Sequence, residues 1–118
     1  MTRPTVTYKA YDVVVVPFPF TDRATTKRRP ALVLSDAAAF NSVVGQSVLA
    51  MITSASNSDW PMDVEIDDLD NAGLTSPSVV RMKLFTLDDQ LIIRKAGELG
   101  EADKASVQRA LSELLVLS

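Results

Sequence analysis

Short apolar runs separated by polar turns organise most of the chain. Runs of this kind, rich in Val, Leu and Ile and bounded by polar residues or Pro, are typical of buried strands. The pattern predicts six strands, at residues 11–16, 30–35, 46–53, 62–67, 78–84 and 91–97. The fourth run alternates strictly between apolar and acidic residues, so its carboxylates are predicted to face solvent: Asp63, Glu65 and Asp67.

A helical period replaces the strand pattern at the C-terminal end. Residues 101–116 carry one apolar stripe at helical spacing, made of Val107, Ala110, Leu111, Leu114 and Leu115. A short helical turn is also predicted at 36–41, with Ser35 or Asp36 as its N-cap. Short strands, tight turns and one long helix predict a single domain spanning residues 1–118. Its predicted fold is mainly β, a small barrel of about five to seven strands with short helices and a C-terminal α-helix.

The composition narrows the chemistry that this fold can carry. The chain has no histidine and no cysteine, which excludes thiolate and imidazole metal sites, disulfides, and Ser-His or Cys-His nucleophile pairs. An enzyme built from this chain must use arginine, lysine, carboxylate, hydroxyl or backbone groups, and we expect neither a metal nor a cofactor. RNA cleavage is compatible with this set, because the 2′-OH of the substrate is the nucleophile and the protein supplies positioning and charge stabilisation.

The sequence also bears on location. It has no apolar run long enough to span a membrane, and its N-terminus lacks the apolar centre of a secretory signal. The cytoplasm is therefore the expected compartment, with no membrane partner.

The chain has a net charge of −3, and its charged residues are unevenly distributed along the sequence. Residues 1–34 hold six basic and two acidic groups, a balance of +4, whereas residues 59–70 hold six acidic groups and no basic one. The basic residues between the first two predicted strands are Arg23, Lys27, Arg28 and Arg29. Pro30 biases Arg29 toward an extended conformation, which aims its guanidinium out of the sheet beside the loop. The segment fits two interpretations, a solvated hairpin loop or a phosphate site.

The segments flanking this loop resemble the MazF/PemK family of toxin endoribonucleases. The resemblance is carried by Tyr-Asp-Val at 11–13, Pro-Phe-Pro-Phe-Thr-Asp at 17–22 and Lys-Arg-Arg-Pro-Ala-Leu-Val-Leu at 27–34. The Pro-Phe-Pro-Phe form is more typical of the PemK-like branch. Met-Ile-Thr-Ser at 51–54 and Val-Val-Arg at 79–81 match further segments in the same order. The resemblance implies an SH3-like barrel with a C-terminal helix, which agrees with the predicted elements.

The resemblance also implies a site. In this family an Arg before Pro in the second strand, a Thr or Ser closing the third and, in the PemK/Kid branch, an Arg in the fifth mark the RNA-cleaving site, here Arg29, Thr53 and Arg81. The two arginines would stabilise the scissile phosphate, and the threonine hydroxyl would bind one of its oxygens. Attack by the 2′-OH would then leave a 2′,3′-cyclic phosphate and a 5′-OH without a metal. Further RNA contacts are expected from Arg23, Lys27, Arg28, Ser54 and Lys83.

One position departs from the family pattern. In the Kid-like branch a carboxylate proposed as general base follows the strand-five Arg by two residues, where this chain has Lys83. The general base is thus unassigned, and Asp22 in the basic loop and a deprotonated Lys83 are the two candidates. The resemblance implies a homodimer that cuts single-stranded RNA and is inhibited by a cognate antitoxin. The alternative is a non-catalytic barrel that binds an antitoxin-like peptide or a protein target such as gyrase.

Two groups of aromatic residues admit a structural and a functional interpretation. Phe18 and Phe20 alternate with prolines and are expected to be core anchors rather than base-stacking platforms. Trp60, the only tryptophan, precedes Pro61 in a polar loop. It is expected to cover the end of the barrel, and stacking on an RNA base or on a partner peptide is the alternative.

Overall fold

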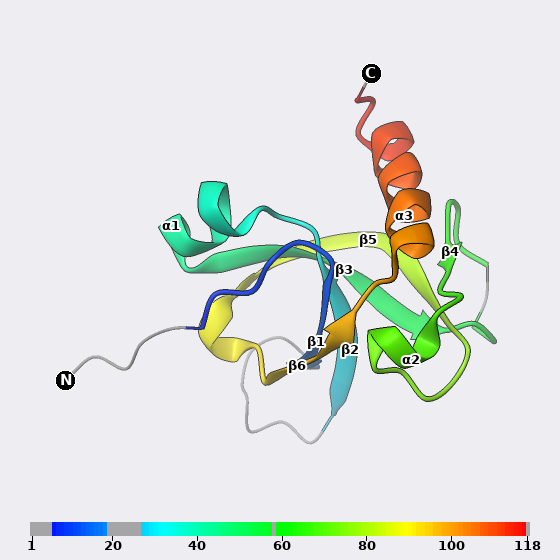
Figure 1. Ribbon diagram of the computed structural model, residues 1–118, viewed down its shortest axis with the longest axis horizontal. Coiled ribbons are helices and arrows are strands. Elements are labelled where there is room, and N and C mark those ends of the chain that lie inside the picture. Colours follow the sequence, from blue (N-terminus) through cyan, green and yellow to red (C-terminus); the bar gives the residue numbers. More distant parts are fainter. Residues whose placement is uncertain (1–5, 19–26, 58, 118) are drawn as a thin grey trace.

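A curled antiparallel sheet forms the body of the molecule (Figure 1). The computed structural model describes residues 6–18, 27–57 and 59–117. Within these residues the sheet has six strands in the order β4-β5-β3-β2-β1-β6, and every pairing is antiparallel. The strands are β1 (Asp12–Pro17), β2 (Arg28–Val33), β3 (Gln46–Ser54), β4 (Val64–Glu65), β5 (Ser78–Asp88) and β6 (Arg94–Glu98). The predicted mainly β architecture is confirmed.

Short helices join the strands, and one longer helix follows β6 (Figure 1). They are the π-helical turn η1 (Ala37–Asn41), α1 (Ser42–Val44), α2 (Leu69–Ala72), the 3-10 turn η2 (Asp89–Leu91) and α3 (Glu101–Leu114). Of the two predicted caps for the first turn, Asp36 is the one used, because its carboxylate accepts the Ala39 N–H at 2.7 Å. No helix in the described part of the chain combines the length and apolar character needed to cross a bilayer.

The apolar core is divided between the two faces of the sheet, because side chains alternate along each strand. One face, called here the Leu49 face, carries the buried residues Tyr8, Val14, Val16, Ala31, Val33, Leu49, Leu87 and Ile92. The other, called the helix face, includes Leu32, Ala50, Ile52 and Val80 and is joined by Val107 and Ala110 of α3. Helix α3 is therefore fixed to the sheet by Val107 and Ala110, in the middle of the helix. The predicted stripe does not pack along its full length, since Leu114 and Leu115 are 36% and 52% exposed.

A tight turn replaces the start of the predicted fourth strand. The Asp63 N–H donates to the Trp60 carbonyl at 3.2 Å, and Met62 has a φ of 67°, which no extended strand permits. The strand consequently shrinks to Val64–Glu65. The prediction that its carboxylates face solvent holds for Glu65 and Asp67 but is wrong for Asp63, which is ion-paired with Arg81.

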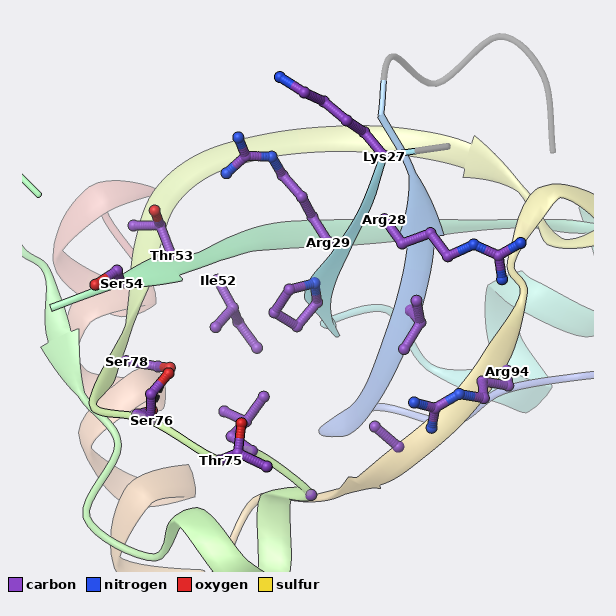
Figure 2. Close-up of a pocket in the computed structure, with 15 residues that line it drawn as sticks. Lys27, Arg28, Arg29, Ile52, Thr53, Ser54, Thr75, Ser76, Ser78 and Arg94 are labelled. Carbon is purple, nitrogen blue, oxygen red and sulfur yellow. Dashed lines mark hydrogen bonds between the residues drawn. The ribbon is translucent and has the colours of Figure 1, made fainter. Parts of the chain in front are cut away.

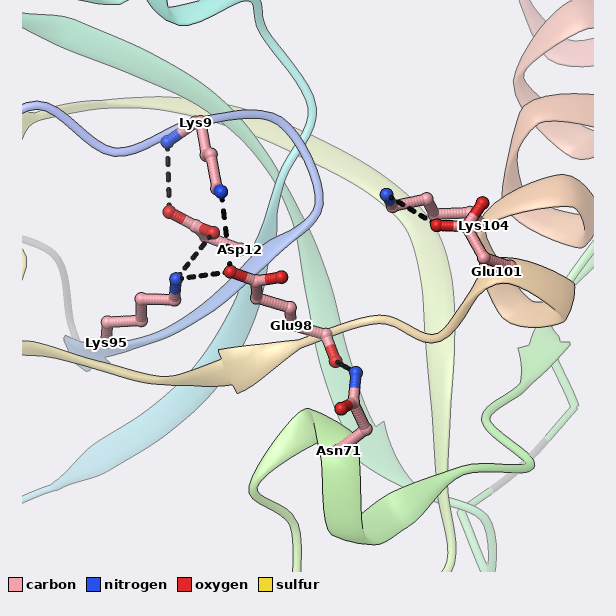
Figure 3. Close-up of polar contacts among 7 residues, drawn as sticks. All are labelled: Lys9, Asp12, Asn71, Lys95, Glu98, Glu101 and Lys104. Atoms are coloured by element: carbon pink, nitrogen blue, oxygen red, sulfur yellow. Dashed lines mark hydrogen bonds and ion pairs between the residues drawn. The ribbon is translucent and has the colours of Figure 1, made fainter.

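Two glycines allow α2 and β6 to meet backbone to backbone. Gly73, with a φ of 73°, lies so close to β6 that a Cβ there would sit 2.1 Å from the Ala96 carbonyl oxygen. A Cβ on Gly97 would sit 2.4 Å from the Asn71 carbonyl oxygen. The Asn71 side-chain amide also donates to the Glu98 carbonyl at 2.8 Å (Figure 3). These contacts fix the start of the segment 73–76, which forms one wall of the pocket described below.

A cluster of paired charges ties β1 to β6 (Figure 3). Asp12 is only 3% exposed, and its carboxylate lies 3.2 Å from Lys95 Nζ and accepts the Lys9 N–H at 3.0 Å. Glu98 lies 2.7 Å from Lys95 Nζ and 3.5 Å from Lys9 Nζ. The hydrogen bond between Lys95 and Glu98 raises the pKa of Lys95 and lowers the pKa of Glu98. We refer to Lys9, Asp12, Lys95 and Glu98 as the paired cluster.

Candidate active site

A pocket of about 640 Å³ opens where β2 begins and β3 ends (Figure 2). Its lining comprises Val15, Lys27, Arg28, Arg29, Pro30, Ile52, Thr53, Ser54, Gly73, Leu74, Thr75, Ser76, Ser78, Arg94 and Ala96. Four of these residues are cationic, and no carboxylate lies among the described residues of the lining. A concave surface with one sign of charge concentrates counter-ions, so the pocket suits an anion.

Strand pairing explains why these residues meet. Val15 of β1 lies opposite Pro30 on one side and opposite Arg94 on the other. Ser54 at the end of β3 lies opposite Ser78 at the start of β5. An apolar floor is thus bounded by a cation from β6 and by hydroxyls from β3 and β5, as Figure 2 shows.

Arg29 lies within β2 rather than in the loop before it, and it is half-buried. The centre of its guanidinium is 4.8 Å from the centroid of the Phe18 ring, a cation–π distance. Figure 2 shows its side chain extending toward Thr53, whereas Arg28 extends away from both. Ala31 pairs with Met51, and continuing this register by two residues sets Arg29 opposite Thr53. Phe18 therefore supports a pocket cation, a role that neither sequence interpretation gave it.

Thr53 is held by the turn that follows β3. Its Oγ1 accepts a hydrogen bond from the Asn57 side-chain amide, and the Asn57 N–H donates to the Ser54 carbonyl at 3.1 Å. Because Asn57 uses a lone pair of the hydroxyl, that bond leaves the hydroxyl hydrogen to be donated. The hydroxyl hydrogen of Thr53 is therefore available for an anion in the pocket.

Arg81 shares a sheet face with Thr53 but does not line the pocket. Met51 pairs with Arg81 and Thr53 pairs with Val79, which places Arg81 diagonally across from Thr53. The Asp63 carboxylate binds the guanidinium in two places, 3.2 Å from Nε and 2.9 Å from Nη2. This hydrogen bonding raises the pKa of Arg81. The structure thus brings Arg29 and Thr53 together in the pocket and holds Arg81, diagonally across from Thr53, in a separate ion pair.

The predicted RNA-contacting residues divide into three groups. Lys27, Arg28 and Ser54 line the pocket. Lys83 is exposed on β5 and lies outside the lining, with its Nζ 5.8 Å from the centroid of the Trp60 ring. Arg23 lies outside the described residues.

Asp22, one of the two general-base candidates, also lies outside the described residues.

Trp60 is 41% exposed, and its ring lies over Arg81 as well as Lys83, with the Arg81 guanidinium 5.6 Å from the ring centroid. The aromatic ring is therefore placed over two cations.

Sequence reasoning missed several residues of this region: Arg94, Thr75, Ser76, Ser78 and Asp63. Alternation along β6 indicates that Arg94 and Lys95 point to opposite sides of the sheet. It does not reveal which of the two joins a pocket, because that depends on the pairing of β6 with β1.

Comparisons with known proteins agree with this architecture. A family model described as PemK-like, MazF-like toxin of type II toxin–antitoxin system matches residues 9–115. A search of curated proteins finds no match.

Solved structures give a fold-level match over nearly the whole chain. A MazE–MazF structure from Deinococcus radiodurans aligns with a TM-score of 0.72 at 27% identity, covering 96% of this chain and 99% of that chain. MazF from the same organism aligns with a TM-score of 0.72 at 27% identity, covering 95% and 99%. An endoribonuclease in complex with its cognate antitoxin from Mycobacterial species aligns with a TM-score of 0.73 over 95% and 96%, and its 19% identity shows a shared fold alone.

Proposed function

Because the chain belongs to the family of PemK-like, MazF-like toxins of type II toxin–antitoxin systems, we propose that it is a toxin that cleaves single-stranded RNA independently of metal. The observation that carries the proposal is the placement of Arg29 and Thr53 in a pocket whose described lining has four cations and no carboxylate. Guanidinium groups and a hydroxyl donor are suited to the oxygens of a phosphodiester.

The proposed reaction uses the nucleophile of the substrate. The 2′-OH of one nucleotide loses its proton and attacks the adjacent phosphorus, and the bond from phosphorus to the 5′-oxygen of the next nucleotide breaks. That oxygen takes a proton from solvent, so the products are a 2′,3′-cyclic phosphate and a 5′-OH. Arg29 holds the phosphate and stabilises the charge that grows on its oxygens, while Thr53 donates to one of them. The pKa of arginine, above about 12, makes it a poor proton acceptor or donor at neutral pH. The described lining holds no carboxylate or imidazole, so Asp22 and Lys83 stay the two candidates for the group that accepts the 2′-OH proton.

The other cations bind the rest of the RNA in this proposal. Arg28 and Arg94 contact phosphates that flank the scissile one, and Lys27 contributes at the outer rim. Arg81 supplies a second guanidinium next to Thr53. The expected assembly is a homodimer in the cytoplasm.

A protein inhibitor is part of the same proposal. One similar structure holds MazF together with MazE from Deinococcus radiodurans, and the matching family model describes toxins of toxin–antitoxin systems. We propose that a cognate antitoxin binds this chain and blocks cleavage.

The first experiment incubates the purified protein with single-stranded RNA in EDTA and maps the new ends. We expect 5′-OH and cyclic-phosphate termini. Arg29→Ala should reduce cleavage by at least about 100-fold, the usual cost of removing one group that stabilises transition-state charge. Arg109→Ala is the matched control, because Arg109 is exposed on α3 and lies outside the pocket lining. Cleavage that needs an added divalent metal, or that survives Arg29→Ala, would contradict the proposal.

A second candidate function is a non-catalytic barrel that binds an antitoxin-like peptide or a protein such as gyrase. It is favoured by Lys83, which stands where the Kid-like branch has a carboxylate, and by the net charge of −3, which opposes binding of a polyanion. Induction of the gene in cells separates the two candidates. Growth arrest with broken RNA supports the nuclease, and growth arrest with intact RNA supports a protein target.

A further inference from the structure

The turn at residues 60–63 is built against Arg81. It is closed by the Asp63 N–H, which donates to the Trp60 carbonyl at 3.2 Å. Pro61 and Met62 occupy the two central positions, where a type II turn favours Pro first and a positive φ second. Met62 meets the second requirement with a φ of 67°, an unfavourable conformation for a residue with a side chain. Backbone strain of this kind persists only where surrounding contacts maintain it.

The contacts that maintain the turn converge on one guanidinium. The Asp63 carboxylate lies 3.2 Å from Arg81 Nε and 2.9 Å from Nη2, and only 18% and 15% of the two side chains is exposed. The ring of Trp60 lies 5.6 Å from the same guanidinium. A bidentate pair fixes the plane of a guanidinium as well as its position, which a single hydrogen bond does not.

The location of the pair connects it to the pocket. Arg81 lies opposite Met51, and Thr53 lies two residues farther along β3 on the same face of the sheet. Diagonal neighbours on adjacent antiparallel strands are within reach of long side chains. Arg81 and Lys83, two cations on one face, repel each other unless an anion lies near them, and Asp63 supplies that anion.

From this geometry we infer that Asp63 is a positioning residue for Arg81, holding its guanidinium in the orientation in which it acts on a phosphate bound by Arg29 and Thr53. The inference rests on the proposed RNA cleavage. In the Kid-like branch the carboxylate follows the strand-five Arg by two residues, where this chain has Lys83. Asp63 would therefore supply a carboxylate beside Arg81 from a different segment of the chain. Trp60 covers one side of the pair and limits the directions in which the guanidinium turns.

The test measures kcat and KM for an RNA oligonucleotide with purified full-length variants, together with unfolding in urea. Asp63→Asn should lower kcat by about 10- to 100-fold, the cost of misplacing a catalytic group, and should change KM by less than about 3-fold. Asp63→Glu should recover most of the loss. Glu65→Gln is the matched control, because Glu65 is the next acidic residue, exposed on β4, and its change removes the same charge. Arg81→Lys keeps the charge without the bidentate geometry and should lose about as much as Asp63→Asn.

A double mutant distinguishes positioning from an independent role. The variant combining Asp63→Asn with Arg81→Ala should be no slower than Arg81→Ala alone, because Asp63 acts through Arg81. Additive losses would overturn the inference. The inference is also overturned if the decrease in cleavage rate at acidic pH disappears in Asp63→Asn, since that result makes Asp63 a proton acceptor. An active wild type unaffected by Asp63→Asn overturns the inference alone, whereas a wild type that cleaves no RNA overturns the proposed function and the inference with it.

Discussion

Arg94 and Lys95 are neighbours on β6 with opposite surroundings. Lys95 joins the paired cluster, where it lies 2.7 Å from Glu98 and 3.2 Å from the buried Asp12. Arg94 joins the pocket, where the described lining offers it other cations and no carboxylate. The alternation of side chains sends the two to opposite sides of one strand. Both side chains are cations, so Arg94 and Lys95 differ in whether the fold places a carboxylate next to them.

This difference separates stability from function. A cation with a native carboxylate partner contributes to folding, because the attraction exists only when the strands are paired. Cations gathered without a carboxylate repel one another and slightly destabilise the native state, and an incoming anion relieves that repulsion. We therefore expect substitutions in the pocket to change RNA cleavage and substitutions in the paired cluster to change stability.

The largest expected effect is on the pocket side of the comparison. Arg94→Ala should lower kcat/KM for RNA cleavage by about 10- to 100-fold, because it removes a charge-assisted phosphate contact. Its free energy of unfolding should stay within about 0.5 kcal/mol of wild type. Lys95→Ala, the adjacent control, should cleave RNA at the wild-type rate. Equal losses of activity in both variants would break the comparison.

The next effect is on stability. Lys95→Ala should lower the free energy of unfolding by about 1–2 kcal/mol, because it removes a charged partner of the buried Asp12 carboxylate, which keeps the Lys9 N–H. The partial exposure of Lys95 keeps the loss below that of a fully buried pair. Urea unfolding measures the change. Unaltered stability would show that solvent replaces Lys95 without cost.

A smaller effect concerns the salt dependence of RNA binding, measured with an RNA analogue that lacks the attacking 2′-OH. If Arg94 neutralises one phosphate of a single strand, Arg94→Ala should reduce the slope of log affinity against log salt concentration by about 0.7. Lys95→Ala should leave the slope unchanged. A slope that is the same in wild type and Arg94→Ala would remove Arg94 from the RNA-binding surface.

The smallest effect is a pH dependence within the paired cluster. The lowered pKa of Glu98 gives stability that is present above its unfolded value of 4.5 and lost as the pH falls through the folded value. The raised pKa of Lys95 gives stability that is present below its unfolded value of 10.5 and lost as the pH rises through the folded value. The stability difference between wild type and Glu98→Gln should therefore be constant near neutrality and shrink toward both extremes. A difference that does not vary with pH would exclude the ion pair as its source.

Local patterns predicted β1, β2, β3 and β5, because each of these strands buries an apolar run that is visible in the sequence. The predicted fourth and sixth strands are wrong in extent, since β4 spans only Val64–Glu65 and β6 spans Arg94–Glu98, after the apolar run at 91–93. They also placed Arg29 and Thr53 at strand ends, where the structure finds them in one pocket. The contribution of Arg94 depends on the pairing of β1 with β6, and strand pairing is not encoded in the periodicity of either strand. Asp63 was assigned to solvent because alternation assumes an extended strand, and the positive φ of Met62 turns the chain there instead.

Trp60 gives the molecule an optical property. It is the single indole of the chain, it is partly exposed, and two cations lie within 6 Å of its ring centroid. Indole emission responds to the electric field and to the water around the ring. Intrinsic fluorescence of the unlabelled protein therefore reports on events at this one corner of the sheet, and a titration with nucleic acid or with a protein inhibitor can be followed without attaching a dye.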